Sequence, residues 1–235
     1  MDLKGKTAVI TGAGGGMGSV LARALKKEGV NLILVERELS FLDHLTDLVD
    51  GPENAKYECD LSDAGAVAKL TDKIKNDFEK IDLLYNVAGI GIYKNIEDLT
   101  IGEWQGSIAV DLTAPFVLTK ELIGNGLAIV VNFGSGMGVV PSAGRSAYCS
   151  SKFGLRGLSL SLSKELENTD VVLLTLGSVM TNFGTAGIKV REDLEKQGKK
   201  YLTPEEVIEK VIEVTRAEKR KAEYVMYPEG YESSY

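Results

Sequence analysis

Short runs of apolar and β-branched residues recur along the chain, separated by longer segments in which apolar residues return every three or four positions. The first pattern predicts β-strands and the second predicts amphipathic helices. The predicted strands are Thr7 to Thr11, Asn31 to Val35, Ala55 to Cys59, Ile81 to Val87, Leu127 to Phe133, Val171 to Leu176 and Tyr224 to Tyr227. The predicted helices are Met17 to Glu28, Glu38 to Val49, Asp63 to Phe78, Ile101 to Leu122, Arg145 to Glu167 and Pro204 to Arg216.

The alternation of strands and helices predicts the fold class. Strands that are apolar on both faces belong in a parallel sheet that helices cover on both sides. We therefore expect a doubly wound α/β fold of Rossmann type, with seven parallel strands in one domain over residues 1–235. The segment Asn182 to Leu202 is charged and weakly periodic, which favours a substrate lid.

Composition and charge narrow the function classes. A net charge of −7 without a cluster of Lys or Arg argues against nucleic acid and membrane surfaces as partners. The two cysteines, Cys59 and Cys149, lie in no metal-type spacing, so the sequence supports neither a disulfide framework nor a metal site. We find no targeting or membrane-spanning segment and expect a cytoplasmic protein.

A glycine-rich turn follows the first predicted strand. Residues 11–18 read Thr-Gly-Ala-Gly-Gly-Gly-Met-Gly and lead into a predicted helix. Glycines let the backbone turn sharply and approach a pyrophosphate, and the free N–H groups and dipole of the helix favour that negative charge. The position between a strand and a helix favours dinucleotide binding over a merely flexible loop.

Glu36 ends the second predicted strand, 18 positions after the last glycine of the turn. An acidic side chain there accepts hydrogen bonds from the adenosine ribose and repels a 2′-phosphate, so we expect NAD rather than NADP. Arg37 supports the opposite preference, because its guanidinium could pair with that phosphate. A third interpretation is that Glu36, Arg37 and Glu38 form only a solvated charged run.

Ser135 follows the fifth predicted strand, and Tyr148 and Lys152 lie four residues apart at the start of the next helix. That spacing places Tyr148 and Lys152 on one helix face, where the ammonium would lower the phenol pKa from about 10 toward neutral. Tyr148 could then exchange a proton with a substrate oxygen that Ser135 holds. Taken alone, the pair could also be an exposed helical pair.

Together these residues resemble the short-chain dehydrogenase/reductase family over essentially the whole chain. The glycine turn matches, and so do the 13-residue separation of Ser135 from Tyr148 and the segment 86–89, whose second Asn is replaced by Val. The segment 176–181 lacks the family's Pro. The resemblance implies that the cofactor contacts are Gly12, Gly14, Gly16, Met17, Gly18, Glu36, Arg37, Asp60, Leu61, Asn86, Ala88, Gly89, Tyr148, Lys152, Gly177, Val179 and Thr181.

The resemblance also implies hydride transfer between a nicotinamide cofactor and a secondary alcohol or ketone, without a metal. The catalytic residues would be Ser135, Tyr148 as acid/base, Lys152, and Asp111 in place of the family's Asn. In the family, the main-chain carbonyl at that position holds a water that links to the lysine. Pro115 has no N–H to bond the carbonyl of residue 111, so we expect a bend in the helix here.

Two alternative functions remain open. One is an NADPH-dependent reductase of 3-oxoacyl thioesters, against which Glu36 argues. The other is a catalytically impaired nicotinamide-binding regulatory protein, which Asp111 and Leu176 favour and the intact Ser135, Tyr148 and Lys152 oppose.

The sequence does not determine the substrate. The expected pocket walls are residues 90–93, 136–141, Arg145 and the lid, which fit many small alcohols and carbonyls alike. Arg145 could bind an acidic substrate group, although we favour a solvated residue at a helix start. The helix 145–167 is apolar on more than one face, with Leu155 and Leu162 on one stripe and Phe153 off it. A symmetric partner helix could cover the second face, so we expect a homodimer or homotetramer.

Overall fold

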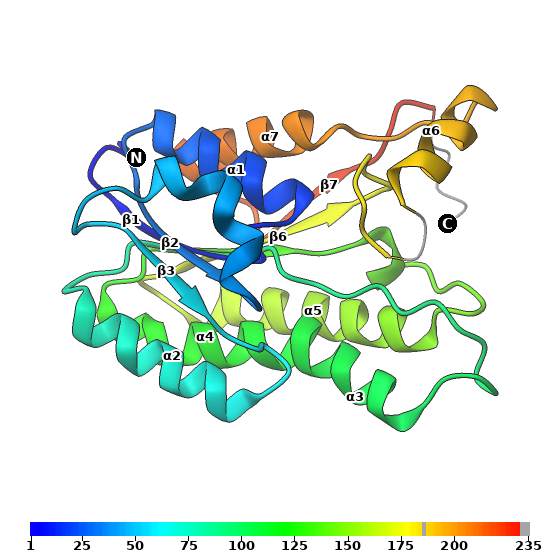
Figure 1. The fold of residues 1–235 in the computed structure, drawn as a ribbon, viewed down its shortest axis with the longest axis horizontal. Helices are drawn as coiled ribbons and strands as arrows, with labels where there is room; N and C mark the ends of the chain where they lie inside the picture. Colours follow the sequence, from blue (N-terminus) through cyan, green and yellow to red (C-terminus); the bar gives the residue numbers. More distant parts are fainter. Residues whose placement is uncertain (185–186, 231–235) are drawn as a thin grey trace.

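The computed structural model describes residues 1–184 and 187–230. One sheet in the order β3-β2-β1-β4-β5-β6-β7 forms the centre of the molecule, and all of its neighbouring strands are parallel. Its strands are β1 (Thr7–Thr11), β2 (Asn31–Glu36), β3 (Ala55–Glu58), β4 (Leu83–Asn86), β5 (Ile129–Phe133), β6 (Asp170–Leu176) and β7 (Glu223–Met226). All seven occupy their predicted positions, which confirms the doubly wound Rossmann-type fold (Figure 1).

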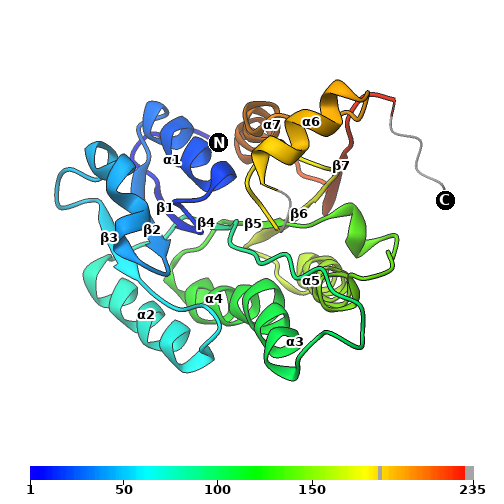
Figure 2. The same ribbon diagram turned by 45° about the vertical axis from the view of Figure 1, so that its right-hand side comes forward.

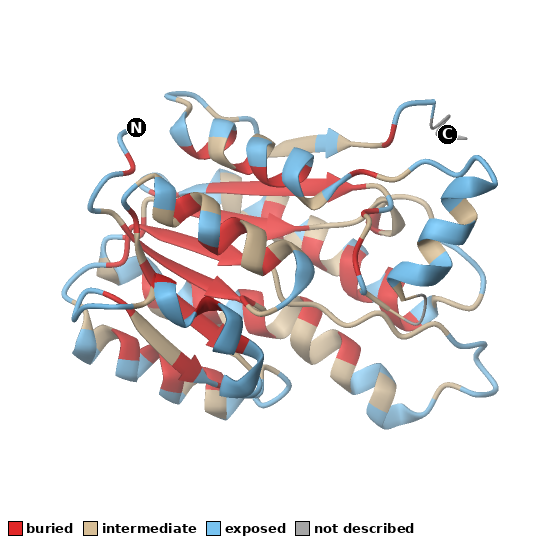
Figure 3. Ribbon diagram, turned by 45° about the horizontal axis from the view of Figure 1, so that its top comes forward, coloured by how far each residue is buried: buried red, intermediate tan, exposed pale blue. Residues whose placement is uncertain are grey.

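Helices cover both faces of the sheet, as Figures 1 and 2 show. On one face lie α1 (Gly16–Lys27) and α7 (Pro204–Arg216), and on the other α2 (Ala64–Asp77), α4 (Ala114–Leu122) and α5 (Ser146–Glu165). Successive strand residues point to opposite faces, so Ile10 joins the apolar core under α1, whereas Val9 joins the core on the α2 side. Figure 3 shows the buried residues gathered in the strands and the helix faces against them.

The predicted helix 38–49 differs from expectation in type. It forms a 3₁₀-helix, η1 (Leu39–Leu48), rather than an α-helix. Its buried residues are Leu42, Leu45 and Leu48, at intervals of three. A 3₁₀-helix has three residues per turn, so this winding puts all three leucines on the face toward the sheet.

The predicted helix 101–122 consists of three parts. α3 (Ile101–Ile108) begins at the expected capping box, in which Thr100 and Glu103 each accept a hydrogen bond from the other's backbone N–H. A π-helical turn, η2 (Ala109–Thr113), then joins it to α4. The wide turn lies where Pro115 leaves the carbonyl of Asp111 without its helical donor, which is the position of the predicted bend.

The predicted lid, residues 182–202, connects the region beyond β6 to α7. It contains α6 (Ile188–Lys196), in which no residue is buried, while residues 185 and 186 lie outside the described residues. A parallel bridge pairs Leu202, the last residue of this segment, with Val179, which lies shortly before it. Within residues 1–184 and 187–230, no helix is long and apolar enough to cross a membrane.

Candidate active site

A cavity of about 630 Å³ opens at the carboxyl ends of β1 and β4, where the strand order reverses. Parallel α/β sheets bind ligands at such a point, because the connections on either side run to opposite faces of the sheet. The glycine turn forms one wall of this cavity. The predicted cofactor residues that line it are Gly12, Gly16, Met17, Gly18, Glu36, Arg37, Asp60, Leu61, Ala88, Gly89 and Thr181.

The glycine turn has the shape that a pyrophosphate requires. Gly12 has a φ of +63°, and a Cβ on Gly18 would lie 2.1 Å from the carbonyl oxygen of Gly12. Side chains are therefore excluded from the contact between the turn and α1. No side chain in the described parts of the chain caps α1 at Gly15, so its first N–H groups remain available to an anion. The residues present thus fit the phosphates of a dinucleotide.

Glu36, the last residue of β2, lines the same cavity. Its carboxylate accepts hydrogen bonds from the N–H of Gly14 at 3.1 Å and the N–H of Arg37 at 3.0 Å, which fix its position beside the turn. Gly14 does not line the cavity but holds Glu36 in place. The guanidinium of Arg37 lies 3.8 Å from the Glu38 carboxylate and is largely exposed. Glu36 is therefore the ordered charge at this wall, and Arg37 is the more exposed one.

A second cavity, of about 490 Å³, adjoins the first. Met17, Thr181 and Phe183 line both, so the two form neighbouring parts of one site. Ser135 lies between β5 and the 3₁₀ turn η4 (Gly136–Gly138), and Tyr148 lies in the first turn of α5. The predicted catalytic and cofactor-binding residues that line the second cavity are Met17, Ser135, Tyr148, Gly177, Val179 and Thr181.

Tyr148 is enclosed by aromatic rings. Its ring centre lies 5.7 Å from those of Tyr93 and Phe183, and the side chain is 6% exposed. Burial raises the pKa of Tyr148, the Asp111 charge raises it further, and the hydrogen bond with Ser135 opposes both. We expected Lys152 to lower this pKa toward neutral, and that expectation is wrong for this structure. The Lys152 ammonium is shared with Asp111, and burial of the phenol dominates.

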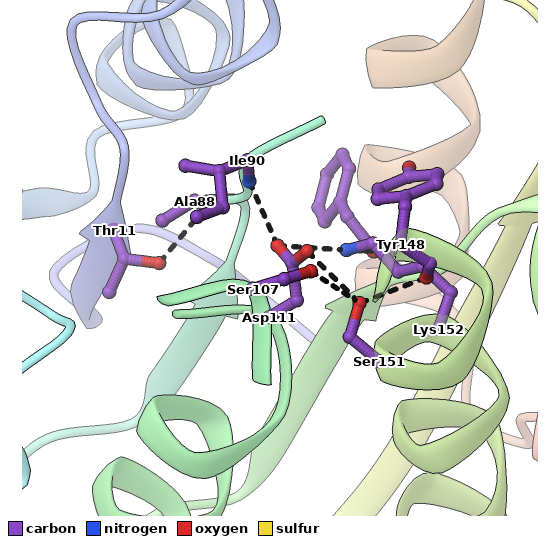
Figure 4. A network of polar contacts seen from close by, with 9 residues as sticks. Thr11, Ala88, Ile90, Ser107, Asp111, Tyr148, Ser151 and Lys152 are labelled. Atoms are coloured by element: carbon purple, nitrogen blue, oxygen red, sulfur yellow. Dashed lines mark hydrogen bonds and ion pairs between the residues drawn. The ribbon is translucent and has the colours of Figure 1, made fainter. Parts of the chain in front are cut away.

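Asp111 lies at the centre of a buried polar network behind Tyr148 (Figure 4). Its Oδ1 accepts a hydrogen bond from the Ile90 N–H at 3.0 Å and lies 3.6 Å from Lys152 Nζ. Its Oδ2 accepts the Ser151 hydroxyl at 3.1 Å. Lys152 Nζ also donates to the carbonyl of Phe133 at 3.2 Å. The structure therefore places Asp111 and Lys152 together, behind the Tyr148 phenol.

Burial and the neighbouring groups shift the pKa of Asp111 in opposite directions. The side chain has no exposed surface, and this desolvation raises the pKa of Asp111, whereas Lys152, the Ile90 N–H and Ser151 lower it. Sequence reasoning missed Ser151, whose single hydroxyl proton can go to Asp111 or to the Tyr148 carbonyl at 2.9 Å. Its position next to Lys152 in the motif was the one available signal.

Asn86 lies below the site rather than in its walls. Its Nδ2 donates to Asn132 Oδ1 at 2.7 Å, and Asn132 Nδ2 donates to the Ser159 hydroxyl at 2.9 Å. This buried chain of amides connects β4, β5 and α5. Within the described residues, Asn86 lines neither cavity. Its hydrogen bonds instead hold the ends of the neighbouring strands together.

Comparison with known proteins identifies relatives over most of the chain. Residues 6–192 match the family described as short chain dehydrogenase. A D-threitol dehydrogenase from Mycolicibacterium smegmatis is 30% identical over 190 residues, covering 77% of this chain and 73% of that protein. A D-beta-hydroxybutyrate dehydrogenase from Rhizobium meliloti is 27% identical over 216 residues, covering 88% of this chain and 82% of that protein. An alcohol dehydrogenase from the archaeon Thermococcus sibiricus, solved with 5-hydroxy-NADP, superposes with a TM-score of 0.87 at 25% identity, covering 99% and 100%.

Proposed function

Because this chain belongs to the short-chain dehydrogenase family, we propose that it is an NAD-dependent oxidoreductase that interconverts a secondary alcohol and its ketone. One observation carries the proposal. Ser135 and Tyr148 line a cavity that shares three residues with the cavity of the glycine turn, and Lys152 lies one turn of α5 beyond Tyr148. A dinucleotide in the first cavity would therefore reach a substrate held in the second.

The chain's own residues supply position and a proton. The Ser135 hydroxyl and the Tyr148 phenol lie side by side and can hold the same substrate oxygen. In reduction Tyr148 gives its proton to this oxygen, and in oxidation it accepts the proton of the alcohol. Since burial and Asp111 raise the pKa of Tyr148, the phenol is protonated at neutral pH and oxidation is favoured by alkaline conditions.

The cofactor would be held by residues from both cavities. The glycine turn and the start of α1 would bind its phosphates, Glu36 and Asp60 its adenosine, and Gly177, Val179 and Thr181 the nicotinamide. When bound, it supplies hydride exchange at the nicotinamide ring, which no side chain of the protein can provide. The ordered carboxylate of Glu36 supports NAD as the preferred form.

A homo-oligomer is part of the same proposal. Phe116 on α4 and Phe153 on α5 are each 43% exposed, and both helices lie on the same face of the sheet (Figure 2). Large exposed apolar side chains on one face of the molecule favour contact with a second copy.

A panel of secondary alcohols and ketones, assayed with NAD(H) and with NADP(H), tests the proposal, with cofactor affinity measured separately by calorimetry. Turnover of alcohols with NAD supports it. Preferential reduction of 3-oxoacyl thioesters with NADPH would favour the thioester reductase instead. Tight cofactor binding without turnover of any compound would favour a regulatory protein.

A further inference from the structure

The second cavity is lined by positive charge in a protein whose net charge is −7. Its charged lining residues are Arg145, Arg191 and Lys199, and no Asp or Glu lines it within residues 1–184 and 187–230. Acidic residues outnumber basic ones in the sequence, 34 to 27, so a wall with only cations departs from the composition of the molecule. Such a wall attracts an anionic ligand.

The arginines of the chain fall into two groups, those outside this cavity and those that line it. Those outside this cavity each pair with a carboxylate: Arg23 with Asp47, Arg37 with Glu38, Arg156 with Glu223, Arg216 with Glu28 and Arg220 with Asp170. The remaining two, Arg145 and Arg191, line the cavity, and neither has a carboxylate within ion-pair distance among the residues that the structure describes.

Arg145 is the one of these two whose N–H groups are available. Arg191 already donates to the carbonyls of Val179 at 2.7 Å and Phe183 at 2.5 Å, and so it ties the lid to the end of β6. Arg145 instead lies over the ring of Tyr93 at 4.2 Å, with only a weak contact to the Met137 sulfur at 3.7 Å. Stacking fixes the plane of a guanidinium and leaves its N–H edge free for a two-oxygen ligand.

The position of Tyr93 connects this cation to the reactive phenol. Tyr93 contacts the Arg145 guanidinium on one side and the Tyr148 ring, 5.7 Å away, on another. The guanidinium carbon therefore lies no more than about 10 Å from the centre of the Tyr148 ring. One small molecule can place an oxygen at Tyr148 and an anion at Arg145.

We infer that the substrate carries a carboxylate that binds Arg145, so that the enzyme acts on a hydroxy acid and its keto acid. This inference rests on the proposed dehydrogenase function. A carboxylate offers the planar pair of oxygens that one guanidinium edge binds. The Tyr93 ring shields the guanidinium from water on one face, which strengthens the pairing.

Pairs of substrates that differ only in charge test this inference. Lactate, 3-hydroxybutyrate and 4-hydroxypentanoate, each as both enantiomers, are compared with their amides in NAD-dependent oxidation. We expect kcat/KM to be at least about tenfold higher for the carboxylate in at least one pair. Arg145→Gln should abolish this preference, mainly by raising KM for the carboxylate.

Arg23→Gln is the matched control, because it removes the same charge from the surface of α1 and should leave the preference unchanged. Equal kcat/KM for acids and amides, or an unaltered preference in Arg145→Gln, would overturn the carboxylate assignment and leave the dehydrogenase function intact. Glycerol 3-phosphate is assayed against glycerol as a further pair. A preference confined to the phosphate would also overturn it.

Calorimetry on the NAD-saturated protein separates the two proposals. If no compound is oxidised but 3-hydroxybutyrate binds at least about tenfold more tightly than its amide, and Arg145→Gln removes the difference, the dehydrogenase function fails and the carboxylate site stands. If no compound is oxidised and acid and amide bind alike, both proposals fail.

Discussion

The substitution Asp111→Asn isolates the charge that lies behind Tyr148, the proposed acid/base. Asparagine preserves the size of the side chain and an oxygen that can accept the Ile90 N–H, 3.0 Å from Asp111 Oδ1. It removes the negative charge 3.6 Å from Lys152 Nζ. The main-chain carbonyl of residue 111, next to the π-helical turn, is unaffected. The change therefore alters electrostatics and little else.

Two distances in the structure determine the expected change in the pKa of Tyr148. Lys152 Nζ lies 3.6 Å from Asp111 Oδ1 and 5.6 Å from the centre of the Tyr148 ring, so this carboxylate oxygen is within about 9 Å of the phenol ring. At an effective dielectric constant of about 20, a unit charge at this distance contributes roughly 2 kcal/mol. Since one pKa unit corresponds to about 1.4 kcal/mol, the substitution should lower the pKa of Tyr148 by about one unit.

The assay is the pH dependence of kcat/KM for alcohol oxidation. In the proposed mechanism oxidation needs ionised Tyr148 as the base, so a lower pKa shifts the rising limb of the profile to lower pH, while the rate on the plateau stays within about tenfold. Ser151→Ala is the control, because it removes the hydroxyl bonded to Asp111 Oδ2 without removing the charge. An upward or absent shift would refute the electrostatic argument. A loss of roughly a hundredfold or more on the plateau would instead make Asp111 a proton carrier.

Three further predictions concern the cofactor, the acid/base and assembly. NADP should bind at least about tenfold more weakly than NAD, a difference of roughly 1.4 kcal/mol, and equal or tighter binding would assign Arg37 to the 2′-phosphate. Tyr148→Phe should abolish turnover while cofactor affinity by calorimetry stays within about twofold, and an active variant would exclude Tyr148 as the acid/base. Light scattering at micromolar concentration should give a dimeric or tetrameric mass, whereas Phe153→Glu should weaken the association; a monomeric wild-type protein refutes this prediction.

The sequence predicted the fold because its signals are local. Each buried strand is a short apolar run, and the order of strands and helices leaves few ways to arrange a parallel sheet. The type of η1 was missed because leucines three apart, as at Leu42 and Leu45, fit one face of an α-helix as well as a 3₁₀-helix. An irregularity before α4 could be predicted, because Pro115 removes a specific hydrogen bond, and the structure has the π-helical turn η2 there.

Spacing along a helix also predicted that Tyr148 and Lys152 lie together, but the consequence of their proximity depends on other elements. Tyr93 comes from the segment after β4, Phe183 from the segment after β6 and Asp111 from η2, and these bury the phenol and neutralise the ammonium. The direction of the Tyr148 pKa shift therefore could not be obtained from the sequence around it.

The interpretation of Arg145 likewise depends on residues that are distant in the sequence. A cation at the start of a helix is solvated by default, because nothing in its local sequence covers it. The fold brings Tyr93, 52 positions earlier in the chain, against its guanidinium, and it leaves every Asp and Glu of residues 1–184 and 187–230 out of the cavity wall. If the arginine were only a surface residue, a nearby carboxylate would be the ordinary partner, as it is for the five arginines outside the cavity. The proposed substrate carboxylate would supply the counter-ion that this half-buried guanidinium, stacked on Tyr93, lacks among the described residues.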